Sequence, residues 1–319
     1  MAPPPRRWRA PGLLMVALMI GACAGPETLR LRAESVPVEL AAVPFHPQDE
    51  YHCGPAALAT VLAADGVDVS PEALVPEIYV PARQGSLQAE IIAAVRRRAR
   101  VPFVLAPHID AALAELHAGR PVLVLQNLGT RGLPVWHYAV VVGFDPRQQR
   151  FVLRSGRERR LEMSARRFLQ SWDRAGRWML VVARPDAPPV SAEVQSWLRA
   201  VAAFESLGEL KIAITAYRAA TRRWPAVPMT WTALGNGLAQ RGLWASAARA
   251  YERALTSGGD TPWLRNNHAW VLAQMGCRAD ALAEIDAALT AAVEPAQRDT
   301  LRDTRARIET LQPDAVCDR

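Results

Sequence analysis

The chain has 319 residues, of which 50% are hydrophobic, 22% charged and 7% aromatic. This composition excludes a disordered, collagen-like or disulfide-dense chain and allows about two domains. The formal net charge is +7, and the loss of three arginines in the N-terminal segment described next would leave +4. A charge this small, with no aromatic residues between the basic ones, predicts no nucleic-acid partner.

The N-terminal segment has the pattern of a leader. Three arginines precede the apolar run 12–20, and two small residues stand directly before Cys23. The run is too short to span a bilayer, which takes about 20 apolar residues. This pattern resembles a bacterial lipobox, which implies a signal peptide over 1–22, acylation of Cys23 and a tether over 23–39. An ordinary secretory leader is the alternative. Because Ala24 is not an aspartate, the resemblance implies the outer membrane, facing the periplasm.

The other cysteines are judged singly. With Cys23 acylated, Cys53, Cys277 and Cys317 remain, an odd number in an oxidising compartment. One of them should be unpaired. A disulfide between Cys277 and Cys317 is one possibility, because both lie in the C-terminal half, but connectivity does not follow from sequence.

A proline-rich segment divides the chain. We predict a linker over 185–193, since closely spaced prolines continue neither a helix nor a central strand. Before it, helical and strand patterns mix, which predicts an α+β domain over 40–184. The expected elements are a helix over 87–98 and strands over 122–125, 138–142, 151–153 and 179–182.

The segment after the linker repeats with a period of 34 residues. When the copies are aligned with this offset, five positions carry similar residues. One position has Gly208, Gly242 and Gly276, and another has Ala213, Ala247 and Ala281. A third begins with Trp197 and Trp231. This pattern resembles the tetratricopeptide repeat, a helix pair per unit. It implies an all-α solenoid of three repeats over 194–295, followed by a capping helix and tail over 296–319. The third copy has Arg265 in the first tryptophan column and His268 in a leucine column, and we interpret His268 as structural.

Cys53 is the candidate nucleophile. Pro55 suits the first turn of a helix, and Leu58, Val61 and Leu62 follow at helical spacing, so Cys53 should stand at a helix N-terminus. The free N–H groups there should lower the thiol pKa. Gln48, on a preceding extended segment, has a side-chain amide that could stabilise an oxyanion. Gly54 should admit a substrate backbone.

A thiolate nucleophile needs a base, and His137 is the candidate. It begins the apolar run 137–143, so a strand would hold its ring on a rigid element. His108 and His117 flank a short predicted helix and are interpreted as surface residues, and His52 should point away from Cys53. A metal site has no recognisable ligand spacing, and neither a metal nor a cofactor is predicted.

Residues 40–184 resemble the papain-like cysteine peptidases of the bacteriocin-processing, double-glycine leader type. Gln48, Cys53-Gly54-Pro55-Ala56 and His137-Tyr138 match that family's oxyanion glutamine, nucleophile and histidine strand. The family's third catalytic residue is an aspartate after the histidine strand, and Asp145 comes too early for that role. A hairpin with its turn near 147 would instead bring Ser155 close to His137, so Ser155, Asp145 or another group orients the ring. Bacteriocin-processing members are fused to a transporter, and this chain has no spanning segment or nucleotide motif.

The predicted function is a lipid-anchored cell-envelope cysteine peptidase that acts by a Cys–His thiol mechanism, with acyl transfer to an amine left open. Its partners would be a peptide or protein substrate, a protein bound by the repeats, and a membrane held through the lipid. The alternative is an inactive peptidase-like scaffold that binds an envelope partner.

Overall fold

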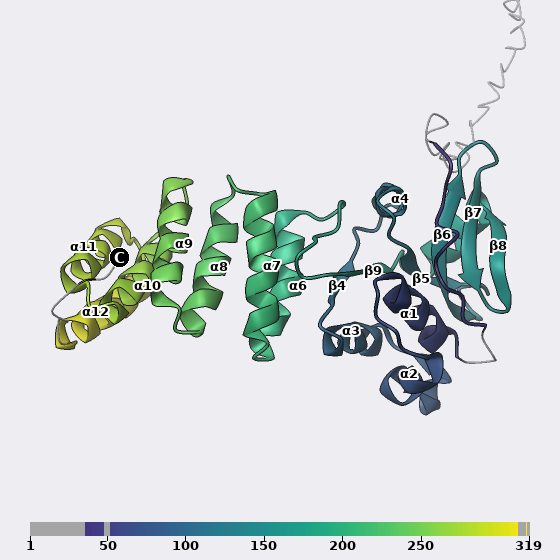
Figure 1. The fold of residues 1–319 in the computed structure, drawn as a ribbon, viewed down its shortest axis with the longest axis horizontal. Coiled ribbons are helices and arrows are strands. Elements are labelled where there is room, and N and C mark those ends of the chain that lie inside the picture. Colours follow the sequence, from purple (N-terminus) through teal and green to yellow (C-terminus); the bar gives the residue numbers. More distant parts are fainter. Residues whose placement is uncertain (1–35, 48–51, 312–316, 318–319) are drawn as a thin grey trace, which may run out of the picture.

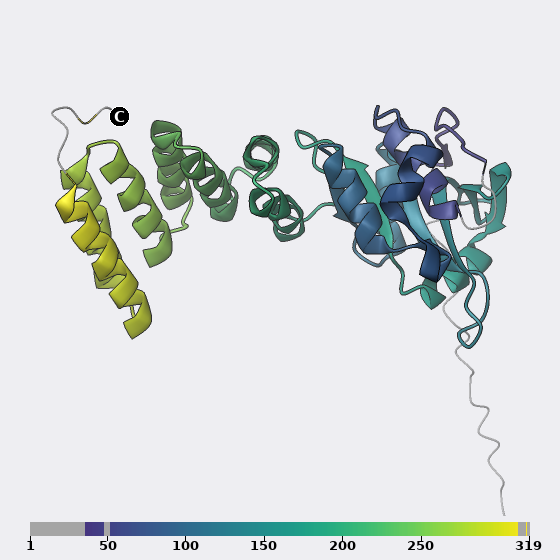
Figure 2. The ribbon, with the colours of Figure 1, turned by 90° about the horizontal axis from the view of Figure 1, so that it is seen from below.

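The structure is a computed structural model that describes residues 36–47, 52–311 and 317. An antiparallel sheet with helices on both faces comes first, and stacked helix pairs follow from it to the C-terminal end (Figures 1 and 2). An α+β domain therefore precedes a helical solenoid similar to tetratricopeptide repeats. No helix among the described residues is long and apolar enough to cross a membrane.

The sheet has the strand order β4-β9-β5-β6-β7-β8, with β1 paired to β6, and every pair is antiparallel. A separate two-stranded hairpin, β2–β3, lies beside α1. The strands are β1 (Val38–Glu39), β2 (Tyr79–Val80), β3 (Gly85–Ser86), β4 (Val101–Val104), β5 (Val122–Asn127), β6 (Trp136–Asp145), β7 (Arg150–Ser155), β8 (Glu158–Ser164) and β9 (Met179–Ala183).

Each face of the sheet has its own apolar core. Alternate residues of β6 point to opposite faces, so Val140 packs with one core and Val141 with the other. The helices of the first face are α1 (Cys53–Ala64), α2 (Pro71–Ile78) and α3 (Gln88–Arg97); those of the second are α4 (Ile109–His117) and α5 (Ala165–Arg174). The three-residue helix η1 (Pro81–Arg83) joins β2 to β3.

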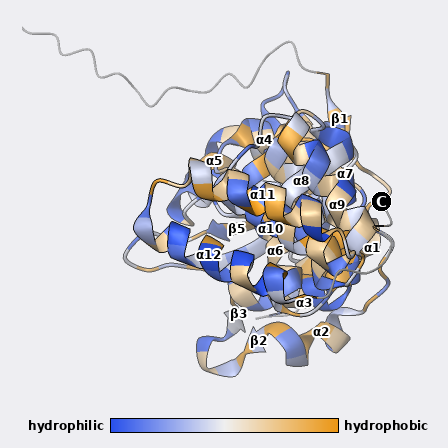
Figure 3. Ribbon diagram, turned by 90° about the vertical axis from the view of Figure 1, so that its left-hand side faces the viewer, coloured by the Kyte–Doolittle hydropathy of each residue, from blue (hydrophilic) through white to orange (hydrophobic). Residues whose placement is uncertain are grey.

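The helical part consists of consecutive antiparallel pairs. They are α6 (Val194–Ser206) with α7 (Leu210–Arg223), α8 (Pro228–Gln240) with α9 (Trp244–Thr256), and α10 (Pro262–Gln274) with α11 (Arg278–Ala291). The largely hydrophilic α12 (Pro295–Thr310) packs on the last pair (Figure 3). Cys277 and Cys317 form a disulfide with their Cα atoms 4.7 Å apart.

The repeated columns have clear physical reasons. Gly208, Gly242 and Gly276 end the first helix of each pair with φ of 78°, 69° and 78°, a conformation that side chains disfavour. The alanine column is fully buried where paired helices meet. In the third pair, Arg265 forms ion pairs with Asp260 and Glu284, and His268 is buried with its Nδ1 3.7 Å from a Glu284 oxygen.

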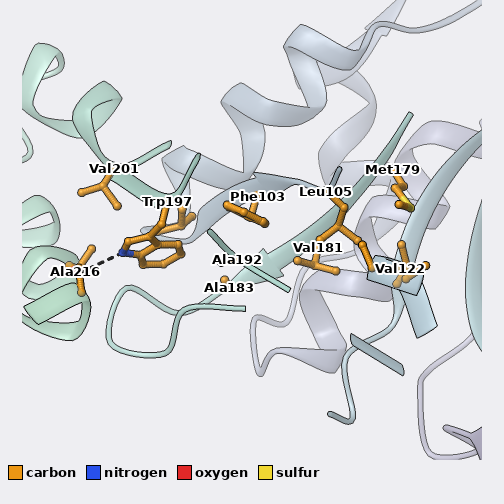
Figure 4. Packing of buried hydrophobic residues seen from close by; sticks show 14 of the residues in the cluster. Phe103, Leu105, Val122, Met179, Val181, Ala183, Ala192, Trp197, Val201 and Ala216 are labelled. Atoms are coloured by element: carbon orange, nitrogen blue, oxygen red, sulfur yellow. Dashed lines mark hydrogen bonds between the residues drawn. The ribbon is translucent and has the colours of Figure 1, made fainter. Parts of the chain in front are cut away.

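The two parts share one apolar core. Trp197 of α6 is fully buried, with its ring 6.2 Å from that of Phe103 on β4, and its indole N–H donates to Ala216 O (Figure 4). The proline-rich segment is held by Glu115 of α4, whose Oε1 accepts hydrogen bonds from the backbone N–H and the hydroxyl of Ser191 at 2.7 and 2.6 Å. Because the predicted linker is packed in this way, we expect it to hold the two parts in a fixed relation.

Candidate active site

Cys53 is the first residue of α1, the helix that packs across the inner strands of the sheet. Its sulfur is hydrogen-bonded by backbone N–H groups of Gly54 and of Tyr138, the residue that follows His137 on β6. These bonds lower the thiol pKa, but burial raises it by more, and the net pKa lies above the ordinary value of 9.0. The N–H groups at the helix N-terminus thus act in the predicted direction, but the expectation of a lowered thiol pKa is not met, because the sulfur is desolvated between α1 and β6.

His137 lies near the start of β6, and Ser155 at the end of β7 holds its ring. The His137 Nε2 and the Ser155 hydroxyl oxygen are 2.8 Å apart, the distance of a good hydrogen bond. Burial lowers the pKa of His137 below its ordinary 6.5, so the imidazole is neutral at pH 7. In the tautomer in which Nε2 carries the hydrogen and donates it to Ser155, Nδ1 is the nitrogen left to accept a proton.

A β-bulge puts these two side chains on the same face. Val141 pairs with Leu153 but Gly143 pairs with Val152, so β6 contains one extra residue between the two pairs. Side chains of two adjacent strands point to the same face of the sheet only if their residues are in the right register. One extra residue in one strand shifts that register, so the side chains beyond it switch to the opposite face relative to the partner strand. On the His137 side of the bulge, Val140 pairs with Arg154. In this register Ser155 lies diagonally across from His137, and both side chains are on the same face of the sheet.

Asp145 lies at the far end of β6 from His137. Its Oδ1 accepts the backbone N–H groups of Arg147 at 2.8 Å and Gln148 at 3.0 Å, as an aspartate does in a tight turn. Eight residues of strand, or about 25 Å at ~3.3 Å per residue, separate it from His137. Of the two groups named as alternatives for orienting the ring, only Ser155 is in reach.

Gly54 accommodates the β2–β3 hairpin. A Cβ at this position would lie 2.3 Å from the hydroxyl oxygen of Ser86 and 2.5 Å from its Cβ. The expectation that Gly54 admits a substrate backbone is replaced by this contact with a neighbouring segment. Tyr138 donates its hydroxyl to Ser86 O at 3.3 Å, so the hairpin is bound to β6 as well as to α1.

Cys53 and His137 both line a cavity of about 940 Å³ between α1, the β2–β3 hairpin and the start of β6. Apolar side chains line much of it, and Val135 and Trp136 are 56% and 55% exposed. Arg83 and Arg157 also line it, whereas none of its described lining residues is acidic. A largely apolar cavity without acidic groups among its described lining residues therefore lies beside Cys53 and His137.

Two predicted site residues, Gln48 and Cys23, lie outside the described residues. Sequence reasoning missed the role of Arg154, which is 3% exposed and whose guanidinium donates to the carbonyl oxygens of Ala41, Val43 and Arg159. It thereby fixes the segment that leads to Gln48. In the sequence, the only sign of this role was that Arg154 stands directly beside the candidate residue Ser155.

Comparison with known proteins bears on the same residues. The model of the Peptidase_C39 like family matches residues 40–178, which include Cys53, His137 and Ser155. Residues 40–178 are therefore similar to this family over that part of the chain. The family implies a peptidase, and we refer to this part as the C39-like domain. No curated protein matches the chain.

Three solved structures illustrate what the chain is similar to. A protein from Bacillus anthracis described as a C39-like peptidase is 17% identical, with 47% of this chain and 98% of that chain covered and a TM-score of 0.41. The peptidase domain of Streptococcus ComA, a bifunctional ABC transporter of a quorum-sensing pathway, is 21% identical, with 44% and 98% covered and a TM-score of 0.37. YrrB, a TPR protein with an unusual peptide-binding site, is 17% identical, with 36% and 58% covered and a TM-score of 0.33.

Proposed function

We propose that the C39-like domain is a cysteine peptidase in which Cys53 is the nucleophile, His137 the general base and acid, and Ser155 the residue that orients the imidazole. The observation that carries the proposal is the position of the Cys53 sulfur. It lies at a helix N-terminus against the backbone of Tyr138, one residue from a histidine that Ser155 holds by Nε2.

The reaction follows from the two neutral groups. His137 Nδ1 takes the proton of the Cys53 thiol as the sulfur attacks the substrate carbonyl carbon, and the carbonyl oxygen becomes an oxyanion. The backbone N–H of Cys53 and the side chain of Gln48 are its proposed donors. The imidazolium then protonates the leaving amine, the C–N bond breaks and a thioester remains. Water, deprotonated by His137, hydrolyses the thioester, and an amine in place of water would give acyl transfer.

Cleavage of a peptide library tests the proposal. The wild-type protein and the Cys53→Ala and His137→Ala variants are incubated with a complex mixture of peptides, and the new N-termini are identified by mass spectrometry. We expect cleavages in the wild-type sample that are absent from both variants, with apolar residues enriched near the cut. Asp145→Asn is the matched control, and its cleavage pattern should equal that of the wild type.

A scaffold without catalysis is the second candidate. Two observations favour it: a serine stands where the family has a carboxylate, and burial raises the pKa of the Cys53 thiol. For a scaffold, Cys53→Ala leaves the protein's role in the cell unchanged, whereas for a peptidase the same substitution removes it.

We also propose that Cys23 is acylated and that its lipid anchors the protein to the cell envelope. The proposed location is the outer membrane, with the protein facing the periplasm. The lipobox pattern before Cys23 supports this proposal. Metabolic labelling with a fatty acid should mark the wild-type protein and not Cys23→Ala, and the variant should move to the soluble fraction. The repeats are proposed to bind a protein partner.

A further inference from the structure

The repeat domain contains a second cavity, far along the chain from Cys53. We call it the repeat groove; its volume is about 530 Å³, and α6, α8, α9, α10 and α12 all contribute to its walls. Its lining combines a carboxylate, amide side chains and aromatic rings, the most important being Glu205, Asn236, Trp244, Tyr251, Asn266 and Trp270. The groove thus has acceptors and aromatic surfaces in one place.

Glu205 is the first reason to expect a cationic ligand. Its Oε1 is buried and has no hydrogen-bond partner among the described residues. Burial raises the pKa of this carboxyl, while a hydrogen bond from Tyr217 lowers it. Within the described part of the chain, no arginine or lysine forms an ion pair with it. A desolvated carboxylate without a cation is unfavourable, and a bound cation would relieve that penalty.

Asn266 is the second reason. Its side-chain Oδ1 is also buried without a partner in the described part of the chain. The neighbouring acceptor, Asn236 Oδ1, is already bonded by the Tyr251 hydroxyl at 2.8 Å and by Asn267 Nδ2 at 3.2 Å. Both Glu205 Oε1 and Asn266 Oδ1 therefore lack hydrogen-bond donors, and a ligand with N–H groups would supply donors of this kind.

The aromatic rings are the third reason. Aromatic faces attract cations, and the Trp270 ring already has the Arg307 guanidinium 4.6 Å from its centre. Tyr251 packs directly against α8 because position 235 is a glycine, where a Cβ would lie 2.4 Å from the tyrosine ring. A glycine inside a helix costs about 0.5–1 kcal/mol relative to alanine, so this close approach is specified by the sequence.

We propose that the repeat groove binds a peptide segment of a partner protein through a lysine or arginine side chain, whose N–H groups pair with the Glu205 carboxylate beside the rings of Tyr251 and Trp244. This inference rests on the proposed role of the repeats in protein binding, and it does not depend on catalysis by Cys53. It names the partner's chemistry as a basic side chain on a peptide segment.

The test uses the full-length mature protein with Cys53→Ala, so that no probe is cleaved. A display library of random octapeptides is selected on this protein and on versions that also carry Glu205→Gln or Glu252→Gln. Glu252 is an exposed residue of α9 that does not line the groove, which makes it the matched control. Thermal melts confirm that all three proteins are folded. The selected peptides are then synthesised, and their dissociation constants are measured.

We expect lysine or arginine to be enriched at one position of the peptides selected on the parent protein and on the Glu252→Gln version. Glu205→Gln should abolish this enrichment and weaken the best peptide at least tenfold. The proposal is overturned if acidic peptides are selected, if no peptide is selected, or if basic peptides bind Glu205→Gln equally well. Peptidase activity is assayed separately on the protein with Cys53 intact, so a failure of either proposal is recognised independently.

Discussion

Replacement of Ser155 tests how the imidazole of His137 is held. In Ser155→Ala the hydrogen bond to Nε2, 2.8 Å long in the structure, is lost. A hydrogen bond between neutral groups contributes about 0.5–1.5 kcal/mol net, so we expect acylation of Cys53 to slow by roughly 2- to 13-fold. A serine can stabilise the imidazolium of the transition state only weakly.

Ser155→Asp should have the opposite effect. A charge-assisted hydrogen bond contributes about 1.5–3 kcal/mol, which exceeds the serine bond by about 1–2 kcal/mol and predicts a rate increase of about 5- to 30-fold. The carboxylate should also raise the pKa of His137, against the lowering that burial causes. Ser155→Asn, which offers an acceptor without a charge, is the matched control and should leave this pKa near its wild-type value.

The assay is the acetylation of Cys53 by p-nitrophenyl acetate, followed by the release of nitrophenolate and by intact mass. The pKa of His137 is read from the NMR signal of its ring proton across a pH series in each variant. If Ser155→Ala acylates as fast as the wild type, and Ser155→Asp leaves the pKa of His137 unchanged, the assignment of Ser155 as the orienting residue is refuted.

Two other predictions concern the same site. Burial lowers the pKa of His137 below 6.5, so the acylation rate should fall only at acid pH, where the base becomes protonated. Burial raises the pKa of the Cys53 thiol above 9.0, and the rate should not fall as the pH rises through that pKa, because the thiolate is the stronger nucleophile. A rate that falls between neutral pH and pH 9 would contradict these directions. Gly54→Ala would bring a Cβ within 2.3 Å of the Ser86 hydroxyl oxygen, so we expect a loss of about 1–3 kcal/mol in urea unfolding together with reduced acylation. Gly132→Ala, where a Cβ meets nothing within 4 Å, should change neither, and equal stability of the two variants would refute the packing argument.

The local sequence predicted much of the peptidase part. The Pro55 helix start and the apolar run after His137 correspond to α1 and β6, because both depend on neighbouring residues. Strand β8 was missed, since Glu158–Ser164 is an exposed edge strand with mostly charged side chains. The direction of the Cys53 pKa was also missed, because its burial comes from β6, which is distant in sequence.

The repeat half shows the same division. The 34-residue period predicted the helix pairs, since the turn glycines and buried alanines recur in each copy. The repeat groove was not predictable, because its residues come from five helices and none of them forms a motif. The anchoring of the proline segment by Glu115 was likewise hidden, because a single glutamate in a short helix has the pattern of a surface residue.

The most direct test of the central claim is the rate at which p-nitrophenyl acetate acetylates Cys53 in the wild-type protein and in His137→Ala. General-base catalysis contributes typically 10²–10⁴-fold, so we expect the wild type to form the acetyl thioester at least about 100-fold faster at pH 7. We also expect it to release the acetyl group and turn over again, while Cys53→Ala acquires no acetyl group at this position. Equal rates in the wild type and His137→Ala would contradict the claim that these two residues act as a catalytic pair.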